Sequence, residues 1–263
     1  MPTPLEFATR LAHQAGSYLL DTFQISGTTA SFKADRSFVT QADLAADHLI
    51  TTAIQQQFPG ETILSEESHT GLPQASQAVW IIDPLDGTTN FSLGLRVWGV
   101  LITRLQAGWP ELCALYFPLL GELYTAQRGQ GACLNGSPIH TRPSDPDQPY
   151  GFFACCSRTH RDYTITIPYK PRIYGSAAYS FCMLARGVAL ISMEVSPKIW
   201  DIAGAYLLVQ EAGGSINPLA GAHPFPLLAG KEYSQINFPT LGTATLALQE
   251  SAQAHITPKT RSG

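Results

Sequence analysis

Two aspartates, Asp83 and Asp86, follow an apolar run in the segment WIIDPLDGTTNF, residues 80–91. Pro84 fixes its own φ angle and favours an extended backbone at Asp83. The turn that follows can direct both carboxylates and the carbonyl of Leu85 toward one point. Carboxylates held this close repel each other unless a positive charge lies between them. Oxygen ligands suit hard cations, above all Mg²⁺ and also Mn²⁺ or Ca²⁺, so the segment predicts a divalent metal site.

The next residues, GTTN at positions 87–90, indicate a turn that opens a helix. Backbone N–H groups of Gly87 and Thr88 would then face an anion, with support from the helix dipole. Metal ligands beside an anion site suggest phosphate chemistry. The same residues also fit an Asx turn that only caps a helix, and the segment by itself leaves both interpretations open.

Further acidic residues lie at places where a second segment could complete such a site. Glu66 and Glu67 close the strand-like segment ETILSEE, and Asp201 begins the apolar helical segment IWDIAGAYLLVQEAGG. Asp43 lies in the first turn of a predicted helix. Each has an ordinary alternative: a solvated acidic loop for the glutamates, and a charge facing the helix dipole for the aspartates.

The composition is that of an ordinary soluble globular protein: 263 residues, 44% hydrophobic, 14% charged and a net charge of −4. Lys and Arg form no block, so we expect no nucleic-acid partner and no anionic membrane partner. No apolar run reaches the length of a membrane span, and the first residues indicate an amphipathic helix rather than a signal peptide. The five cysteines show no C-x-x-C spacing. We therefore expect a cytoplasmic protein with reduced thiols.

Hydrophobic periodicity and breaker residues predict an α+β first half followed by an α/β second half. Helices are expected over 4–23 and from an N-cap at Thr40 to a stop at Pro59, and strands at ETILSEE and VWIID. From Trp98 to about residue 140 the pattern predicts an antiparallel meander. The polar, proline-rich segment 141–149 marks the boundary, and beyond it strands alternate with helices as in a βαβ layer.

Three motifs, WIIDPLDGTTNF, ILSEES and WDIAGAYLLVQEAGG, at their relative spacing resemble the inositol monophosphatase family. This family belongs to the lithium-sensitive, Mg²⁺-dependent phosphatases, and the resemblance runs from VTQAD through GELYTAQRGQGACLNG to the helix at 200–214. It implies a layered αβαβα sandwich whose halves, residues 1–145 and 146–263, share one active site. It also implies a homodimer, lithium sensitivity, and two or three Mg²⁺ ions that Mn²⁺ can replace.

By this resemblance, the first metal is bound by Glu66, Asp83 and the carbonyl of Leu85. The second is bound by Asp83, Asp86 and Asp201, and a weaker third ion again uses Glu66. In such two-metal sites one ion lowers the pKa of the attacking water, and the other stabilises charge on the leaving oxygen.

The resemblance also assigns catalytic roles to Thr88, Asp43 and Glu66. Thr88 is expected to hydrogen-bond the attacking water while Asp43 accepts the threonine proton, and the amides of Gly87 and Thr88 hold the phosphate. Lys33 either orients the acidic cluster by its charge or is a solvated surface lysine.

For the substrate, the family places Gly175, Ser176 and Ala177 against a hydroxyl-bearing ring. Glu194, seven residues before Asp201, has the spacing of the carboxylate that binds sugar or inositol hydroxyls. The expected activity is hydrolysis of a small polyol or sugar phosphate, inositol 1-phosphate first. The alternatives are fructose-1,6-bisphosphatase, histidinol-phosphatase or 3′-phosphoadenosine 5′-phosphate phosphatase activity, and, in another class, a non-catalytic regulatory relative that binds metal or sugar phosphate.

Some positions depart from the family pattern. Ser65 stands where inositol-specific members carry glycine. Lys198 stands three residues before Asp201, where it would contact a second phosphate or remain in solvent. The segment GLRVWGV is as similar to histidinol-phosphatase-like members as to inositol-specific ones. These departures leave the substrate open and do not touch the predicted metal ligands.

Overall fold

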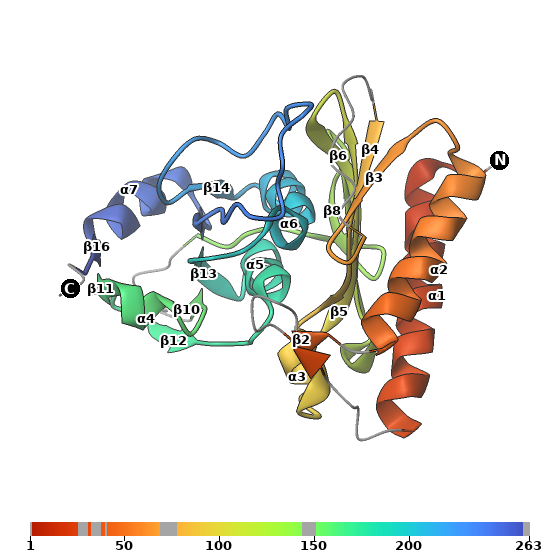
Figure 1. Ribbon diagram of the computed structural model, residues 1–263. Helices are drawn as coiled ribbons and strands as arrows, with labels where there is room; N and C mark the ends of the chain where they lie inside the picture. The colour runs from red at the N-terminus through yellow and green to blue at the C-terminus, as the bar shows by residue number, and fades with distance from the viewer. Residues whose placement is uncertain are drawn as a thin grey trace.

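The computed structural model describes residues 2–25, 31–32, 38–39, 41–68, 78–143 and 151–259, with the backbone alone for residues 24–25, 31–32 and 38–39. Its elements lie in alternating layers of helix, sheet, helix, sheet and helix (Figure 1). The predicted αβαβα sandwich is therefore confirmed. The predicted boundary at residue 145 lies outside the described residues, between the last strand of the first sheet and the first strand of the second.

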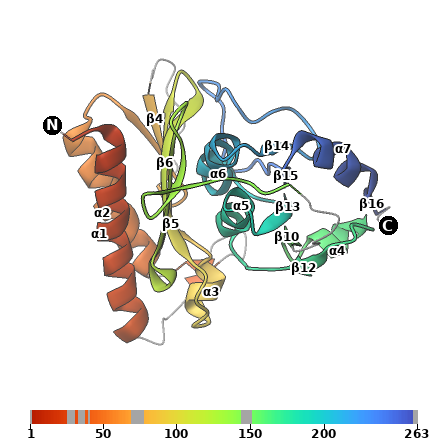
Figure 2. The same ribbon diagram turned by 180° about the vertical axis from the view of Figure 1, so that it is seen from behind.

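The first helical layer contains α1 (Pro4–Ile25) and α2 (Gln41–Gln57) and covers one face of the large sheet (Figures 1 and 2). A capping box begins α1: the Thr3 N–H donates to Glu6 Oε2 at 2.8 Å, and the Glu6 N–H donates to Thr3 Oγ1 at 3.2 Å. Both predicted helices are present, and the predicted N-cap Thr40 lies outside the described residues.

The large sheet has the strand order β3-β4-β5-β6-β7-β8-β9. Only β3 and β4 are parallel, and each later neighbour pairs antiparallel. The strands are β3 (Thr62–Ser65), β4 (Ala78–Asp86), β5 (Gly99–Gln106), β6 (Trp109–Phe117), β7 (Glu122–Gln127), β8 (Gly131–Leu134) and β9 (Ser137–Ile139), with a 3-10 turn η1 (Pro118–Leu120) after β6. The predicted meander is confirmed as β5 to β9.

Beyond this sheet lie α5 (Ala177–Ala185) and α6 (Ile199–Glu211), and then a second sheet with the order β12-β10-β13-β15-β14. Its strands are β10 (Phe152–Cys155), β12 (Lys170–Arg172), β13 (Ala189–Glu194), β14 (Ser215–Pro218) and β15 (Thr240–Thr243). The predicted βαβ unit exists as β10-α5-β13, because β10 and β13 are parallel. The strand β15, whose direction the sequence did not predict, runs antiparallel to both its neighbours.

The remaining elements are short or lie on the far side of the second sheet. They are β1 (Ser31–Phe32), β2 (Phe38–Val39), α3 (Thr88–Ser92), α4 (Thr159–Asp162), β11 (Tyr163–Ile165), α7 (Leu246–Ala254) and β16 (Ile256–Pro258). Figure 1 shows α7 and α4 in the outermost layer, at the opposite side of the molecule from α1 and α2.

Two hydrophobic cores follow from the alternation of side chains along the central strands. Trp80 and Ile82 of β4 pack in the core that includes α1 and α2. Val79 and Ile81 of the same strand pack in the core that includes α5, α6 and the second sheet. Because β4 is buried on both faces, its first five residues, 78–82, are all apolar and show no alternation with polar residues.

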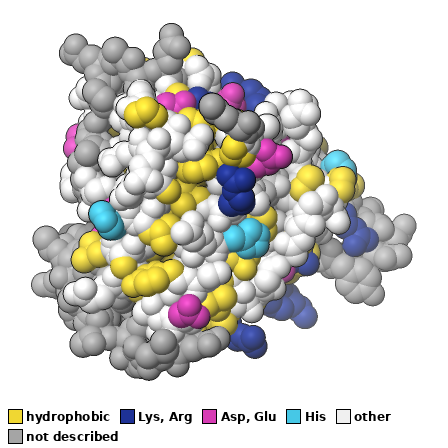
Figure 3. All heavy atoms as spheres, turned by 90° about the vertical axis from the view of Figure 1, so that its right-hand side faces the viewer, with side chains coloured by type: hydrophobic (Ala, Val, Ile, Leu, Met, Phe, Trp, Pro, Cys, Tyr) yellow, Lys and Arg dark blue, Asp and Glu magenta, His cyan; other side chains and the backbone are white. Residues whose placement is uncertain are grey.

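The outer face of the first helical layer is chemically mixed. In Figure 3, Lys and Arg side chains are scattered among acidic, neutral and apolar ones. Among the described residues, no helix combines the length and the apolar character needed to cross a membrane.

Candidate functional site

The strand β4 contains a β-bulge between Asp83 and Asp86. Asp83 pairs with Leu101 and Asp86 pairs with Gly99, so one extra residue of β4 lies between these two register positions. In a regular strand, residues three apart point to opposite faces. The bulge reverses that parity, which is why Leu85 packs in the same core as Ile82 while Asp86 faces α5. The sequence-based expectation that the strand ends at Asp83 was wrong, since β4 continues through Asp86.

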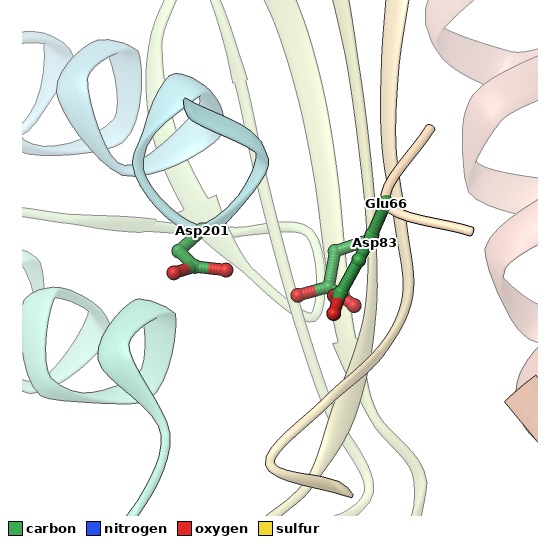
Figure 4. A group of neighbouring side chains, drawn as sticks. All are labelled: Glu66, Asp83 and Asp201. Carbon is green, nitrogen blue, oxygen red and sulfur yellow. The ribbon is translucent and has the colours of Figure 1, made fainter. Parts of the chain in front are cut away.

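Three carboxylates from separate segments converge beside this bulge. One oxygen from each of Glu66, Asp83 and Asp201 lies within 4.8 Å of the others. Figure 4 shows Glu66 and Asp83 next to each other, with Asp201 facing them from the first turn of α6. The backbone of Glu66, just after β3, is held to β4 because its N–H donates to the carbonyl of Ile82 at 3.1 Å.

Each aspartate of the cluster is oriented by a backbone donor. The Leu85 N–H donates to Asp83 Oδ1 at 3.0 Å, and the Lys198 N–H donates to Asp201 Oδ2 at 2.7 Å. Burial raises the pKa of both carboxyls, and the neighbouring acids raise it further: Glu66 first for Asp83, and Asp86 first for Asp201. The cluster therefore concentrates negative charge that a cation would relieve.

Asp86 lies outside that three-membered cluster and links β4 to the segment that begins α5. Its Oδ2 accepts a hydrogen bond from the Ser176 hydroxyl just before α5, and the backbone N–H groups of Ala177 and Ala178 act to lower its pKa. Burial, the largest effect, raises the pKa of Asp86 to about 7, although these donors act in the opposite direction. Ser176 is also the N-cap of α5, since its Oγ accepts from the Tyr179 N–H at 3.0 Å.

Thr88 and Asp43 come together, as the resemblance implies, although 45 residues separate them. The Thr88 Oγ1 lies 3.3 Å from Asp43 Oδ1 and 3.0 Å from the carbonyl oxygen of Leu85. Asp43 is buried in the first turn of α2. Gly87, the N-cap of α3, has φ +84°, and a Cβ there would lie 2.9 Å from the carbonyl oxygen of Val97. Glycine is therefore required at this position.

The buried Ser65–Asp47 pair was missed from the sequence. Ser65 hydrogen-bonds to Asp47 Oδ1, and Asp47 lies one helical turn after Asp43 on α2. Both side chains are buried. Ser65, which had suggested altered substrate selection, thus holds β3 against α2, and it is not among the residues that line the described cavity.

A cavity of about 360 Å³ opens beside the carboxylates. Asp201 belongs both to the cluster and to the cavity wall. The lining residues that the structure describes are Asp86, Thr89, Asn90, Cys156, Ser157, Ile173, Gly175, Ser176, Ala177, Glu194, Ser196, Pro197 and Asp201. All four substrate-facing residues expected from the second half (Gly175, Ser176, Ala177 and Glu194) are in this set.

Asn90 and Gly175 shape one wall of the cavity. The Asn90 Nδ2 donates to the carbonyls of Val97 and Tyr174, each at 2.7 Å, and so holds the segment before α5 against α3. Gly175 has φ +75°, and a Cβ there would lie 2.7 Å from Asn90 Oδ1. The role of Asn90 was not predicted, because one of its partners, the Tyr174 carbonyl, lies 84 residues away in the sequence.

The structure describes one of the two lysines singled out in the sequence. Lys198 is the half-buried N-cap residue of α6 and is not one of the described cavity-lining residues. Lys33 lies outside the residues whose side chains are described.

The donor set fits a divalent metal. The cluster offers carboxylate oxygens from Glu66, Asp83 and Asp201, the carbonyl of Leu85 lies on the adjacent bulge, and Asp86 lines the same cavity as Asp201. Oxygen donors without sulfur or imidazole are the set that Mg²⁺, Mn²⁺ or Ca²⁺ prefers.

Comparisons with known proteins show the family of the chain. The model of the inositol monophosphatase family matches residues 3–254. The Nus factor SuhB of Salmonella typhimurium is 36% identical over 250 residues, which cover 84% of this chain and 87% of that protein. A histidinol-phosphatase of Chlorobaculum parvum is 32% identical over 226 residues, covering 81% and 85%.

Among solved structures, an IMPase/NADP phosphatase complexed with Mg²⁺ and phosphate has the same fold. It superposes with a TM-score of 0.77 at 21% identity, over 92% of this chain and 90% of that one. The family match over nearly the whole chain, the identity with curated relatives and the shared fold lead to one conclusion. The chain belongs to the inositol monophosphatase family.

Proposed function

We propose that this protein is a metal-dependent phosphomonoesterase that hydrolyses a small polyol or sugar phosphate. The observation that carries the proposal is the convergence of Glu66, Asp83 and Asp201 within 4.8 Å, with Asp201 also on the wall of a 360 Å³ cavity. A metal site beside a cavity of this size can hold the phosphate and the alcohol of a small ester together.

In the proposed reaction Glu66, Asp83, Asp201 and the Leu85 carbonyl would hold Mg²⁺, with Asp86 as a further ligand. Mg²⁺ bound there would supply an activated water at neutral pH and would stabilise charge on the leaving oxygen.

The chain's own groups orient the reactants. The Thr88 hydroxyl, which lies between Asp43 and the Leu85 carbonyl, is proposed to hydrogen-bond the attacking water and to take a proton from it while its own proton passes to Asp43. The amides of Gly87 and Thr88 are proposed to contact the phosphate. Glu194, Gly175 and the α5 residues Ser176 and Ala177 would contact the alcohol.

Family membership supports the phosphatase class but leaves the substrate open. Inositol 1-phosphate is our first proposed substrate, and the similarity to a histidinol-phosphatase keeps histidinol phosphate as an alternative. The homodimer, the lithium sensitivity, the location in the cytoplasm and the division at residue 145 stay predictions.

A second candidate function comes from the relatives named Nus factor SuhB, which favour a regulatory role through another protein. The phosphatase candidate needs the acidic cluster for catalysis, whereas the regulatory candidate does not. A binding protein would tolerate the loss of one carboxylate, whereas a phosphatase would not.

The test is phosphate release from p-nitrophenyl phosphate and inositol 1-phosphate. We expect activity that EDTA abolishes and Mg²⁺ restores, and a loss of at least about a hundredfold in Asp83→Asn, the scale on which catalytic groups act. No release from a broad panel of phosphate esters with Mg²⁺ or Mn²⁺ would contradict the proposal and favour the regulatory candidate.

A further inference from the structure

The buried hydrogen bond between Ser65 and Asp47 lies beside the metal cluster without being part of it. Ser65 is the last residue of β3 and is fully buried. Asp47 belongs to α2 and is 7% exposed. Neither residue belongs to the described carboxylate cluster, and neither is among the described residues that line the cavity. An effect of this pair on the site must therefore pass through its neighbours.

Each partner is next to a residue with a proposed role in the reaction. Asp47 follows Asp43 by four residues, so both carboxylates project from the same face of α2. Ser65 directly precedes Glu66, one of the three converging carboxylates. The Ser65 hydroxyl donates to Asp47 Oδ1. This hydrogen bond therefore connects the helix of the proposed proton acceptor to the strand that leads into a proposed metal ligand.

The strand β3 lies at an edge of the large sheet. It has four residues, and within the described part of the chain it pairs with β4 alone. Beyond that pairing, the Glu66 N–H donates to the carbonyl of Ile82 at 3.1 Å. These backbone contacts act within the plane of the sheet. The hydrogen bond from Ser65 leaves that plane toward α2, which covers one face of the sheet (Figure 1), and it acts at the residue next to Glu66.

Two routes therefore join the proposed proton acceptor to the metal cluster. One route runs through Thr88, whose Oγ1 lies 3.3 Å from Asp43 Oδ1, and through β4, to which Glu66 is hydrogen-bonded. The other route runs along α2 and through the hydrogen bond between Asp47 and Ser65. Two independent connections fix the separation of Asp43 and Glu66 more closely than one connection does.

A buried carboxyl is a costly way to pack a helix on a strand, because an apolar side chain needs no hydrogen-bond partner. A hydrogen bond provides what apolar packing does not, since it fixes the distance and the direction between two atoms. In metal sites, groups that orient the ligands without touching the metal change its affinity by about 10- to 100-fold. The Ser65–Asp47 hydrogen bond is placed to act in this way on Glu66.

We propose that Ser65 and Asp47 are positioning residues, whose hydrogen bond holds Glu66 in place beside the other two carboxylates of the cluster and so sets the affinity for Mg²⁺. The inference rests on the proposed metal-dependent function and adds to it two residues that touch neither the substrate nor the reacting atoms. Loss of the hydrogen bond is expected to weaken Mg²⁺ binding and to leave substrate binding at saturating Mg²⁺ unchanged.

Calorimetric titration with Mg²⁺ compares the wild type with Ser65→Ala and Ser65→Thr. We expect the dissociation constant of Mg²⁺ to rise about tenfold in Ser65→Ala, the lower end of the range for groups that orient metal ligands. Ser65→Thr keeps the hydroxyl and should restore most of this affinity. Asp47→Ala should weaken binding too, and the double variant should bind Mg²⁺ no more weakly than the weaker single variant, because both changes remove the same hydrogen bond.

The matched control is Ser215→Ala on β14, an edge strand of the second sheet. Ser215 likewise donates from a strand to a helix side chain, Gln249 Oε1 on α7. This variant should lose unfolding free energy in urea with no change in the affinity for Mg²⁺. It shows what the loss of a purely structural hydrogen bond does.

Unchanged affinity for Mg²⁺ in Ser65→Ala, together with a loss of stability like that of Ser215→Ala, would overturn the inference. Multiplicative losses in the double variant would overturn the pairing of Ser65 with Asp47. At saturating Mg²⁺, KM for inositol 1-phosphate should stay within about twofold of the wild type, and a tenfold rise would place the effect in the cavity instead.

The titration also separates this inference from the proposed function. A wild type that binds Mg²⁺ but hydrolyses no phosphate ester would contradict the phosphatase proposal, while the affinities of the variants would still decide the role of the pair. A wild type that binds no Mg²⁺ would contradict both.

Discussion

At the scale of single residues, one inserted position in β4 determines which groups can share a ligand. The motif predicts that Asp83 and Asp86 act together, but in a regular strand they would point to opposite faces. The bulge between their register positions turns Asp86 toward α5, while Leu85 stays in the core that includes α1 and α2. Bulges often re-aim side chains next to active sites, and this one is proposed to do so for a metal centre.

Glu194 gives a pH-dependent prediction at the same scale. Burial raises the pKa of this carboxyl from 4.5 to about 8, with a smaller contribution from the charge of Asp86. A raised folded-state pKa means that the stabilising protonated form is fully present below pH 4.5 and is lost as the pH rises through about 8. Glutamine resembles the protonated acid at every pH. In EDTA, Glu194→Gln should therefore become progressively more stable than the wild type over this interval.

Urea unfolding at a series of pH values measures this difference. The trend should exceed that of the exposed control Glu250→Gln. A stability difference for Glu194→Gln that stays constant from pH 4.5 to pH 8 would show that the carboxyl titrates normally in the fold.

At the scale of elements, α6 is the part that brings Asp201 to the site. Gly204 sits where the helix crosses the large sheet: a Cβ there would lie 2.7 Å from Leu115 Cδ2 and 2.8 Å from Thr103 Oγ1. The close approach of helix and sheet therefore requires glycine, although glycine lowers helix propensity. This packing holds the first turn of α6, which carries Asp201, at the wall of the cavity.

Gly204→Ala tests this packing. Two contacts below 3.0 Å put the cost in the upper part of the overpacking range, about 2–3 kcal/mol, and the better helix propensity of alanine returns only about 1 kcal/mol, so we expect a net loss of unfolding free energy of about 1–2 kcal/mol. Gly60→Ala is the control, since a Cβ at Gly60 would have nothing within 4 Å. Denaturant unfolding of both variants measures the effect. An unchanged or higher stability of Gly204→Ala would mean that α6 is not packed this closely.

At the scale of the whole molecule, apolar periodicity and glycine and proline breaks predict the first two helices and the meander, and the resemblance carried by the acidic motifs predicts the layered fold. The proposed site residues come from the same motifs. These signals are local in the sequence. The sequence could not predict the Ser65–Asp47 pair, the hydrogen bonds that Asn90 donates to the carbonyls of Val97 and Tyr174, or the hydrogen bond from Ser176 to Asp86. Apart from the bond to Val97, each joins groups far apart in the chain, so no local pattern marks it.

The same reason explains the error at β4 and the open direction of β15. The end of β4 was misplaced because Pro84 resembles a strand terminator, whereas here it occupies the bulge. The direction of β15 was not predicted, because alternation of strands and helices indicates an α/β layer without fixing the direction of its last strands.

The central claim, that Glu66, Asp83 and Asp201 form a metal centre, is tested most directly by calorimetric titration of the purified protein with Mg²⁺. Asp83→Asn removes one charge and keeps an oxygen for the Leu85 N–H, so its fold can be verified by circular dichroism before the titration. Asp21→Asn, an exposed change on α1, removes the same charge away from the cluster. We predict saturable Mg²⁺ binding by the wild type and by Asp21→Asn, and affinity at least about tenfold weaker in Asp83→Asn, because loss of one charged ligand costs more than about 1.4 kcal/mol. Equal Mg²⁺ affinity in all three proteins would contradict the account.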